Sequence, residues 1–583
     1  MPQTPTTAPA ARTPAAGPAA RRRPWLIQGG MGVGVSGWRL ARAVSREGQL
    51  GVVSGTALDV VLARVLQTGD PGGHARRALA AFPLPELAQT ALDCYFRPDG
   101  LGAGPDARMR TTPRLRAAGG SPAEVLTVLG NFVEVWLAKE GHDGAVGVNY
   151  LEKIQLATAP AMFGAILAGV DHVLVGAGVP GQIPALADRL ARCEPCVTRV
   201  AVEGDERPLD HVFDPAALLA GHVPGPLRRP EVLAIVSLPV LAAYLARDEA
   251  TRPDGFVIET SGAGGHSAPP RGPMRRGGSG EPVYGPRDHP DLATMAALGL
   301  PFWLAGGQAS PEAVAAARAA GAAGVQIGSA FALCEESGMA RALREELLDR
   351  AHAGTLTVRN DPEASPTGFP FKVVELPGTV SEPEVAAGRR RVCDLGFLRT
   401  PVRGPRGLVY RCAAEPVAAY VRKGGDPADT RGRRCLCNGL LATIGLAQRR
   451  PGGRAGGAPA GDDRQGPVVP AEALPGRVPV HGGGRGAVAG GGGALTDARV
   501  RHPRGAGPSP VLCGPGGQPF RKPERKSSSS QRESPQPPRR KSSRQSSWWT
   551  RTGTNVTERT STLYTVSPGC SSRSTRPPHA RFG

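Results

Sequence analysis

The amino-acid sequence predicts an α/β fold in which eight parallel strands close into a (β/α)8 barrel of the TIM type. Three glycine-rich segments, at 262–266, 305–307 and 326–329, each follow a short apolar run. Glycine at the end of a strand lets backbone N–H groups approach an anion, because no Cβ blocks them. In such barrels the loops after the last two strands often hold a phosphate. Three successive segments therefore favour one phosphate site, although a single glycine pair is equally typical of a tight turn.

Each expected strand is an apolar run that a helical segment separates from the next, which is typical of a parallel sheet. A helix is expected at 37–47, with Ser36 as its N-cap, and another at 311–320, between the last two strands. The eight expected strands are 25–28, 49–53, 145–149, 172–175, 231–236, 255–260, 300–304 and 323–327.

The rest of the chain divides by composition. Glycine and proline supply 23 and 18 of the last 133 residues, which is typical of low-complexity disorder. An abrupt change near residue 450 is also what a shifted reading frame would produce; a natural disordered extension is the competing hypothesis. We expect a disordered leader at 1–23, the barrel at 24–331 with a helical insertion at 57–140, a helical extension at 332–450 and a disordered tail at 451–583.

The positive charge of the chain lies mostly in this tail. The whole sequence has 70 Lys and Arg against 50 Asp and Glu, a net +20, and residues 451–583 have 21 against 7, a net +14. A basic segment without a folded scaffold gives no specific nucleic-acid site. No apolar stretch approaches the length of a membrane helix, so neither a membrane span nor a membrane partner is expected.

Cysteine usage favours a reducing, cytoplasmic setting, because ten cysteines at irregular spacings do not form a disulfide framework. A lone CxxC pair at 193–196 is weak support for a metal. The other group has atypical zinc spacing, so buried free thiols and no metal site are expected; it comprises Cys393, Cys412, Cys435 and Cys437.

Five segments, taken in order, resemble the nitronate monooxygenase (2-nitropropane dioxygenase) family of FMN-dependent TIM-barrel flavoenzymes. The resemblance covers about residues 24–375. It implies an oxidoreductase that binds FMN and acts on a small-molecule substrate with O2. The segments are Ile27-Gln-Gly-Gly-Met-Gly32, Gly147-Val-Asn149, Ser261-Gly-Ala-Gly-Gly-His266, Ala305-Gly-Gly307 and Gln326-Ile-Gly-Ser-Ala-Phe331.

The resemblance also implies positions for the FMN. Met31 and Gly32 would lie by the isoalloxazine ring, and Asn149 would hydrogen-bond its polar edge. From the residues alone, Met31 is also readable as a core side chain and Asn149 as a turn residue at a strand end. The expected phosphate ligands are Gly264, Gly265, Gly306, Gly307, Gly328 and Ser329.

One segment departs from the family pattern. In the monooxygenases a histidine on the fourth strand starts the oxidation of nitroalkanes, whereas the matching stretch here is Val175-Gly-Ala-Gly178. A preformed nitronate does not need that base, so nitronates suit this chain better than neutral nitroalkanes. His266, which follows Gly264-Gly265, is the expected catalytic acid or base. Its alternative role is to hold the phosphate loop.

Three functions stay open at this point. The first is nitronate-monooxygenase-like oxidation of a nitronate or a similar small carbanion-type substrate with O2. The second is an FMN-dependent enoyl- or acyl-thioester reductase that uses NAD(P)H, with Arg271, Arg275 and Arg276 meeting a phosphorylated acyl carrier. The third is a non-catalytic barrel that acts as a binding module.

Overall fold

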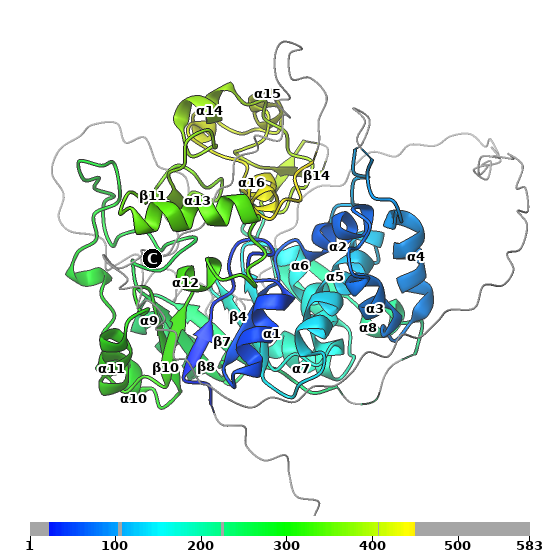
Figure 1. Ribbon diagram of the computed structural model, residues 1–583, viewed down its shortest axis with the longest axis horizontal. Helices are drawn as coiled ribbons and strands as arrows, with labels where there is room; N and C mark the ends of the chain where they lie inside the picture. The colour runs from blue at the N-terminus through cyan, green and yellow to red at the C-terminus, as the bar shows by residue number, and fades with distance from the viewer. Residues whose placement is uncertain (1–22, 103–107, 223–224, 226, 406, 449–583) are drawn as a thin grey trace, which may run out of the picture. The chain divides into compact units, whose positions relative to one another are not determined.

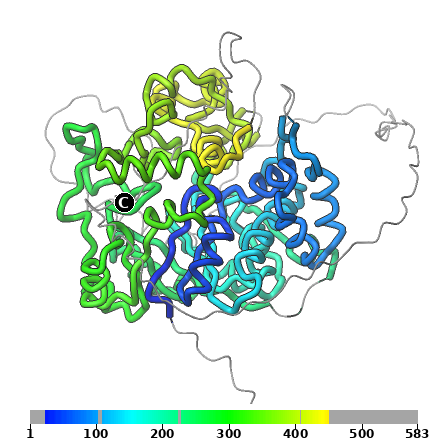
Figure 2. The backbone as a smooth tube through the Cα atoms, viewed as in Figure 1, coloured from blue at the N-terminus to red at the C-terminus, as the bar shows by residue number. Residues whose placement is uncertain are grey.

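The fold is that of a computed structural model, which describes residues 23–102, 108–222, 225, 227–405 and 407–448. The predicted disordered tail, and all but the last residue of the predicted leader, lie outside these residues. Figure 1 gives the arrangement of the elements, and Figure 2 follows the backbone from the barrel into the extension that succeeds it.

Eight parallel strands form a closed barrel, which confirms the predicted fold class. Around the barrel the order is β1-β10-β9-β8-β7-β4-β3-β2. The interior is filled by side chains of several strands, among them Leu50, Leu174 and Trp303, which are almost completely buried. The strands are β1 (Leu26–Gln28), β2 (Leu50–Ser54), β3 (Val146–Leu151), β4 (His172–Gly176), β7 (Glu231–Val236), β8 (Gly255–Glu259), β9 (Phe302–Ala305) and β10 (Gly324–Ile327).

The helices alternate with these strands and cover the barrel (Figure 1). The described residues of the predicted insertion at 57–140 form four helices, and α5 packs on both α2 and α6. Gly130 of α5 permits that packing, because a Cβ there would lie 2.5 Å from the carbonyl carbon of Leu58. The helices up to the end of the barrel are α1 (Trp38–Arg46), α2 (Leu58–Gln67), α3 (His74–Ala80), α4 (Pro85–Tyr95), α5 (Pro122–Lys139), α6 (Gln155–Leu167), α7 (Ile183–Ala191), α8 (Pro215–Leu218), α9 (Pro239–Arg247), η1 (Pro286–Asp288), α10 (Leu292–Ala297), α11 (Pro311–Ala319) and α12 (Ser329–Ala332).

The N-terminus of α1 differs from the prediction, because Ser36 is not its cap. The Ser36 hydroxyl donates to Gly29 O at 3.0 Å and accepts from Met31 N at 3.0 Å. It thus stabilises the loop after β1. The helix begins after Gly37, and the first-turn N–H of Trp38 donates to the Glu134 carboxylate of α5 at 2.9 Å. A distant carboxylate has replaced the local cap.

The extension after the barrel also differs, since the sequence predicts helices there and the structure adds two antiparallel strand pairs. Strand β11 pairs with β12, and β13 pairs with β14. A third antiparallel pair, β5 (Cys196–Val200) with β6 (Leu209–Phe213), was not predicted either. The hydrophobic pattern of the sequence does not identify these short strands, because residues distant in sequence complete their burial. The elements of the extension are α13 (Arg341–His352), β11 (Val358–Asp361), β12 (Phe371–Val374), α14 (Pro383–Gly388), β13 (Thr400–Gly404), β14 (Gly407–Arg411), α15 (Val417–Arg422), η2 (Pro427–Thr430) and α16 (Leu436–Thr443).

Within the described ranges, no helix is both long enough and apolar enough to span a lipid bilayer.

Candidate active site

The three glycine-rich segments start at one edge of the barrel. Strands β8, β9 and β10 are neighbours, and Ala305 of β9 is in register with Glu259 of β8 and with Gln326 of β10. Since the strands are parallel, their carboxyl ends meet and the loops that follow emerge together. The structure therefore brings to one edge the loops that carry the six expected phosphate ligands: Gly264, Gly265, Gly306, Gly307, Gly328 and Ser329.

The loops after β8 and β9 pack tightly on each other. Gly306 has a φ of +94°, and a Cβ there would lie 2.6 Å from Ala263 N and also strike the Thr260 hydroxyl. Thr260 N donates to Ala305 O at 3.1 Å, and Ala263 N donates to Thr260 O at 3.0 Å. Only glycine fits at position 306, so this contact sets the shape of the expected phosphate site, hereafter the cradle, which the loops after β8, β9 and β10 form.

The loop after β1 packs in the same way against β3. A Cβ on Gly30 would lie 2.5 Å from the Cβ of Asn149, whose amide donates a long hydrogen bond to Leu174 O at 3.4 Å. Asn149 is therefore held at the carboxyl end of β3, where the flavin was expected. The Met31 side chain is buried in an apolar cluster with Ala332 and Met339, an environment typical of a core residue.

A segment of the extension covers the loop after β8, a feature that the sequence did not predict. Ser267 N donates to Pro370 O at 2.9 Å, and Lys372 N donates to Gly265 O at 2.9 Å. His266 and Phe371 form an antiparallel bridge, with their rings 4.9 Å apart and tilted by 66°. Residues 365–372, hereafter the covering segment, thus join the predicted site.

His266 lies between the barrel loop and the covering segment. Its Nε2 is hydrogen-bonded to the Ser365 hydroxyl at 2.7 Å. Burial, with a smaller contribution from the Lys153 ammonium, lowers the pKa of His266 to about 3. The imidazole is therefore neutral near pH 7. It can exchange a hydrogen bond there, but it does not carry a stored proton.

Two lysines at the site were missed in the sequence. Lys372 Nζ donates to Ser261 O at 2.7 Å and lies 3.4 Å from the Ser267 hydroxyl, and burial lowers its pKa to about 8. Lys153 follows β3, and its Nζ lies 3.8 Å from the centroid of the Phe369 ring. The available signal was that Lys153 comes four residues after Asn149 and that Lys372 comes two residues after the turn-rich segment 365–370.

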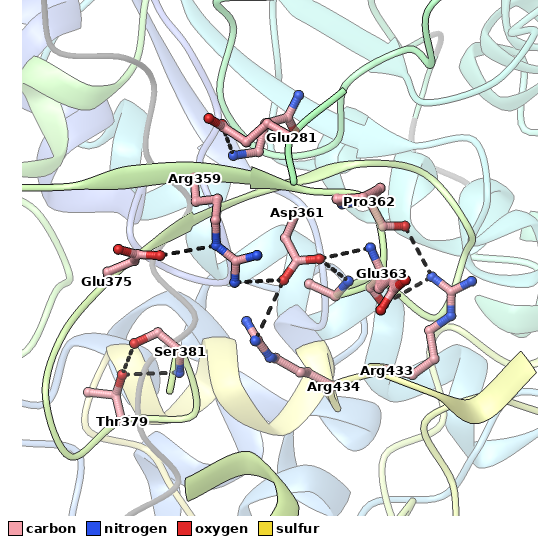
Figure 3. Close-up of polar contacts among 12 residues, drawn as sticks. Glu281, Arg359, Asp361, Pro362, Glu363, Glu375, Thr379, Ser381, Arg433 and Arg434 are labelled. Carbon is pink, nitrogen blue, oxygen red and sulfur yellow. Dashed lines mark hydrogen bonds and ion pairs between the residues drawn. The ribbon is translucent and has the colours of Figure 1, made fainter. Parts of the chain in front are cut away.

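A polar network, drawn in Figure 3, lies next to the covering segment and helps to hold it in place. Arg433 Nη1 donates to Glu363 O at 3.0 Å and to Ser365 O at 2.7 Å. Asp361 forms ion pairs with Arg359 at 3.1 Å and with Arg434 at 3.5 Å. Arginines just before α16 therefore set the position of Ser365, the residue that contacts His266.

The long loop at 267–290 joins the same network. Glu281 accepts from Asn360 N at 2.6 Å, and Arg276 pairs with Glu363 at 2.9 Å. Of the three arginines expected to meet an acyl carrier, Arg276 is thus already paired within the chain. Arg275 is exposed and Arg271 is half-buried.

The fourth barrel strand offers no imidazole at its carboxyl end. β4 ends at Gly176, and the carboxylate of Glu152 occupies the space where a Cβ of Gly178 would be. Gln155 donates to Glu152 at 2.6 Å. The histidine of this strand, His172, is at the opposite end, 3.3 Å from Glu231. The predicted departure from the family pattern therefore stands in the structure.

In the part of the chain that the structure describes, no three His, Cys, Asp or Glu side chains are placed to hold a metal ion. The cysteines of both groups considered above are free thiols. Burial raises the pKa of Cys196 to about 12, which keeps it protonated.

A closed barrel of eight parallel strands, with glycine loops, lysines and a histidine gathered at its carboxyl edge, defines an α/β-barrel enzyme. Residues 227–363 match the family model for nitronate monooxygenase, and this segment contains β7 to β11. The match confirms the predicted resemblance over these residues, and the protein is accordingly an oxidoreductase. A match to an enzyme family does not support the third function, that of a non-catalytic barrel that acts as a binding module.

No curated protein matches the chain. Similar solved structures include FabK from Thermotoga maritima, with 18% identity over 61% of this chain and 72% of that chain and a TM-score of 0.33. A nitroalkane oxidase from Streptomyces ansochromogenes has 17% identity over 60% and 77%, with a TM-score of 0.33. The enoyl reductase domain of MlnA from Bacillus amyloliquefaciens has 14% identity over 62% and 65%, with a TM-score of 0.33.

Proposed function

We propose that the protein is an FMN-dependent oxidoreductase that oxidises a nitronate, or a similar small carbanion-type substrate, with O2. The observation that carries the proposal is the joint position of the loops after β8, β9 and β10, with Gly306 packed on Ala263. Such loops offer many backbone donors to one phosphate. When bound, FMN would supply the electron transfer from substrate carbon to O2.

The residues around the cradle fit a phosphate group. Gly264, Gly265, Gly306, Gly307, Gly328 and Ser329 would hold it, and Lys372 would add positive charge, since its Nζ lies at Ser261 on the β8 loop. Asn149 would contact the ring. For Met31 and Gly32 we propose contact through the loop backbone, because the Met31 side chain is already buried in the core.

His266 would act as a neutral group that orients the substrate or exchanges a proton with it. Its low pKa excludes a stored proton near neutrality, but a neutral imidazole can accept one as charge changes on the substrate. The contacts with Ser365 and Phe371 equally support its alternative role of fixing the phosphate loop.

One observation favours the second function, the enoyl- or acyl-thioester reductase. The fourth strand lacks the monooxygenase histidine, and the histidine that is present follows the Gly264-Gly265 pair. For that reaction NAD(P)H would supply the electrons, and exposed Arg275 would meet a phosphorylated carrier.

Two measurements test the proposal. Acid release followed by chromatography should recover FMN from the purified protein, and recovery of FAD, or of no flavin from a folded sample, would contradict it. Anaerobic reduction then separates the two reactions. Rapid bleaching of the flavin by a nitronate supports the oxidase-type reaction, whereas bleaching by NADPH alone supports the reductase. We also propose a cytoplasmic location, which the irregular spacing of the ten cysteines supports and fractionation of the cells tests.

A further inference from the structure

Lys153 carries an ammonium group that the protein does not neutralise. Among the described residues, no hydrogen bond or ion pair is formed by its Nζ, which lies 3.8 Å from the Phe369 ring. Burial lowers the pKa of Lys153, so its charged form is incompletely solvated. A cation over an aromatic ring is stabilised by the ring's quadrupole, which does not neutralise its charge. The group is thus short of an anion.

The nearest carboxylate in the sequence does not fill this role. Glu152 lies against Gly178 and accepts a hydrogen bond from Gln155 at 2.6 Å, so it faces the helices outside the barrel. Burial also raises the pKa of Glu152, which weakens it as a counter-ion. Its charge raises the pKa of Lys153, but among the described residues the two side chains form no ion pair.

Lys153 instead faces the predicted reaction site. It follows β3 and His266 follows β8, two strands that β4 and β7 separate in the barrel. The covering segment brings the two groups together, and the Lys153 charge contributes to the lowered pKa of His266. Phe369 and Phe371 of the covering segment contact Lys153 and His266 respectively. The Lys153 ammonium and the neutral His266 imidazole therefore both lie beside aromatic rings of the covering segment.

We propose that Lys153 binds the oxyanion of the substrate, a planar group with two oxygens such as a nitronate or a carboxylate on a short aliphatic chain. This inference rests on the proposed function and names the residue that recognises the two oxygens of its substrate. The Lys153 ammonium contacts the charged oxygens, the His266 side chain lies beside them, and the aromatic rings contact the alkyl part. A neutral thioester would leave the ammonium without a partner.

The test compares propionate with its neutral analogue propionamide by calorimetric titration of the purified, flavin-loaded protein. Wild type should bind propionate at least about tenfold more tightly than propionamide. Lys153→Met should lose this difference, with an unchanged flavin content, and Lys153→Arg should keep most of it. The matched control is Lys423→Met, which removes the same charge from a lysine that pairs with Glu415 in the extension. The KM for ethyl nitronate should rise in Lys153→Met in parallel.

Other outcomes would overturn the proposal. Equal binding of propionate and propionamide by wild type would show that no charge is recognised. Loss of FMN from Lys153→Met with retained binding of riboflavin would assign Lys153 to the cofactor phosphate instead. If the purified protein binds no flavin, the proposed function fails, yet the same titration of that protein still decides whether Lys153 recognises an anion.

Discussion

Gly30 and Asn149 form a contact that leaves no room for a side chain at position 30. A Cβ on Gly30 would lie 2.5 Å from the Cβ of Asn149 and 3.0 Å from its side-chain carbonyl oxygen. The contact joins the loop after β1 to the end of β3, two strands that β2 separates in the barrel. It therefore fixes where the amide of Asn149 lies at the carboxyl edge.

The first prediction follows from this contact. Gly30→Ala should lower stability by about 1–3 kcal/mol, the usual cost of overpacking, and reduce the flavin content. Adding Asn149→Gly to it should recover part of the lost stability, because that change removes the opposing Cβ. Thermal unfolding of both single variants and the double variant measures the coupling. The control is Gly388→Ala, since nothing lies within 4 Å of a Cβ there. An equal effect of the control would contradict the steric explanation.

The second prediction concerns Lys372 and pH. Its pKa is lowered to about 8, so its positive charge is lost as the pH rises through 8. We expect the affinity for FMN to fall between about pH 7 and 9, whereas affinity for riboflavin, which has no phosphate, should stay constant. Lys372→Met should bind FMN more weakly at pH 7 and lose this pH dependence. A parallel response of riboflavin would place the effect elsewhere.

The third prediction distinguishes the two roles of His266. If the imidazole exchanges a proton with the substrate, His266→Ala should lower turnover by roughly a hundredfold or more and leave the flavin content near normal. Loss of FMN would instead support the loop-holding role. Since burial lowers its pKa to about 3, His266 should contribute no ionisation to the rate between pH 5 and 8. Ser365→Ala, which removes its hydrogen-bond partner, should have a smaller effect of the same kind.

The fourth prediction concerns Glu134, which accepts from the first turn of α1. Burial raises its pKa from 4.5 to about 7, so the folded protein binds this proton more tightly than the unfolded chain. That contribution to stability is present below pH 4.5 and is lost as the pH rises through 7. Glu134→Gln keeps an acceptor for Trp38 without the charge. The substitution should raise the melting temperature by roughly 2–4 °C more at pH 8 than at pH 5. An effect that is equal at both pH values would exclude titration of this carboxyl.

The last prediction is that residues 451–583 are dispensable. All the described strands and helices end by Thr443, and the composition beyond residue 450 does not favour a packed core. A chain truncated after Arg450 should therefore keep its melting temperature and its flavin content. A large loss of either would show that the removed segment contributes to the fold. Resequencing the coding DNA across codon 450 tests the reading-frame hypothesis separately.

Residues whose partners are near in sequence were predictable. The eight barrel strands could be predicted because each is a short apolar run, and a run buried on both faces shows its nature locally. Helix α11 was predictable for the same reason, since Ser310 accepts from Ala313 N within its own first turn. The cap of α1 was not, because Glu134 lies 96 residues from Trp38.

The barrel, the order of its strands along the chain and the three glycine loops could be predicted from the amino-acid sequence, because strand burial and glycine geometry are local properties. The surroundings of those loops depend on tertiary contacts. The tertiary structure placed Lys372, Ser365 and Phe371 of the extension against a loop about 100 residues earlier, and Lys153 beside Phe369. Such contacts depend on the closure of the barrel and on the arginines that hold the covering segment. The low pKa of His266 likewise arises from its burial beneath that segment. The residues near His266 in the sequence do not predict this burial.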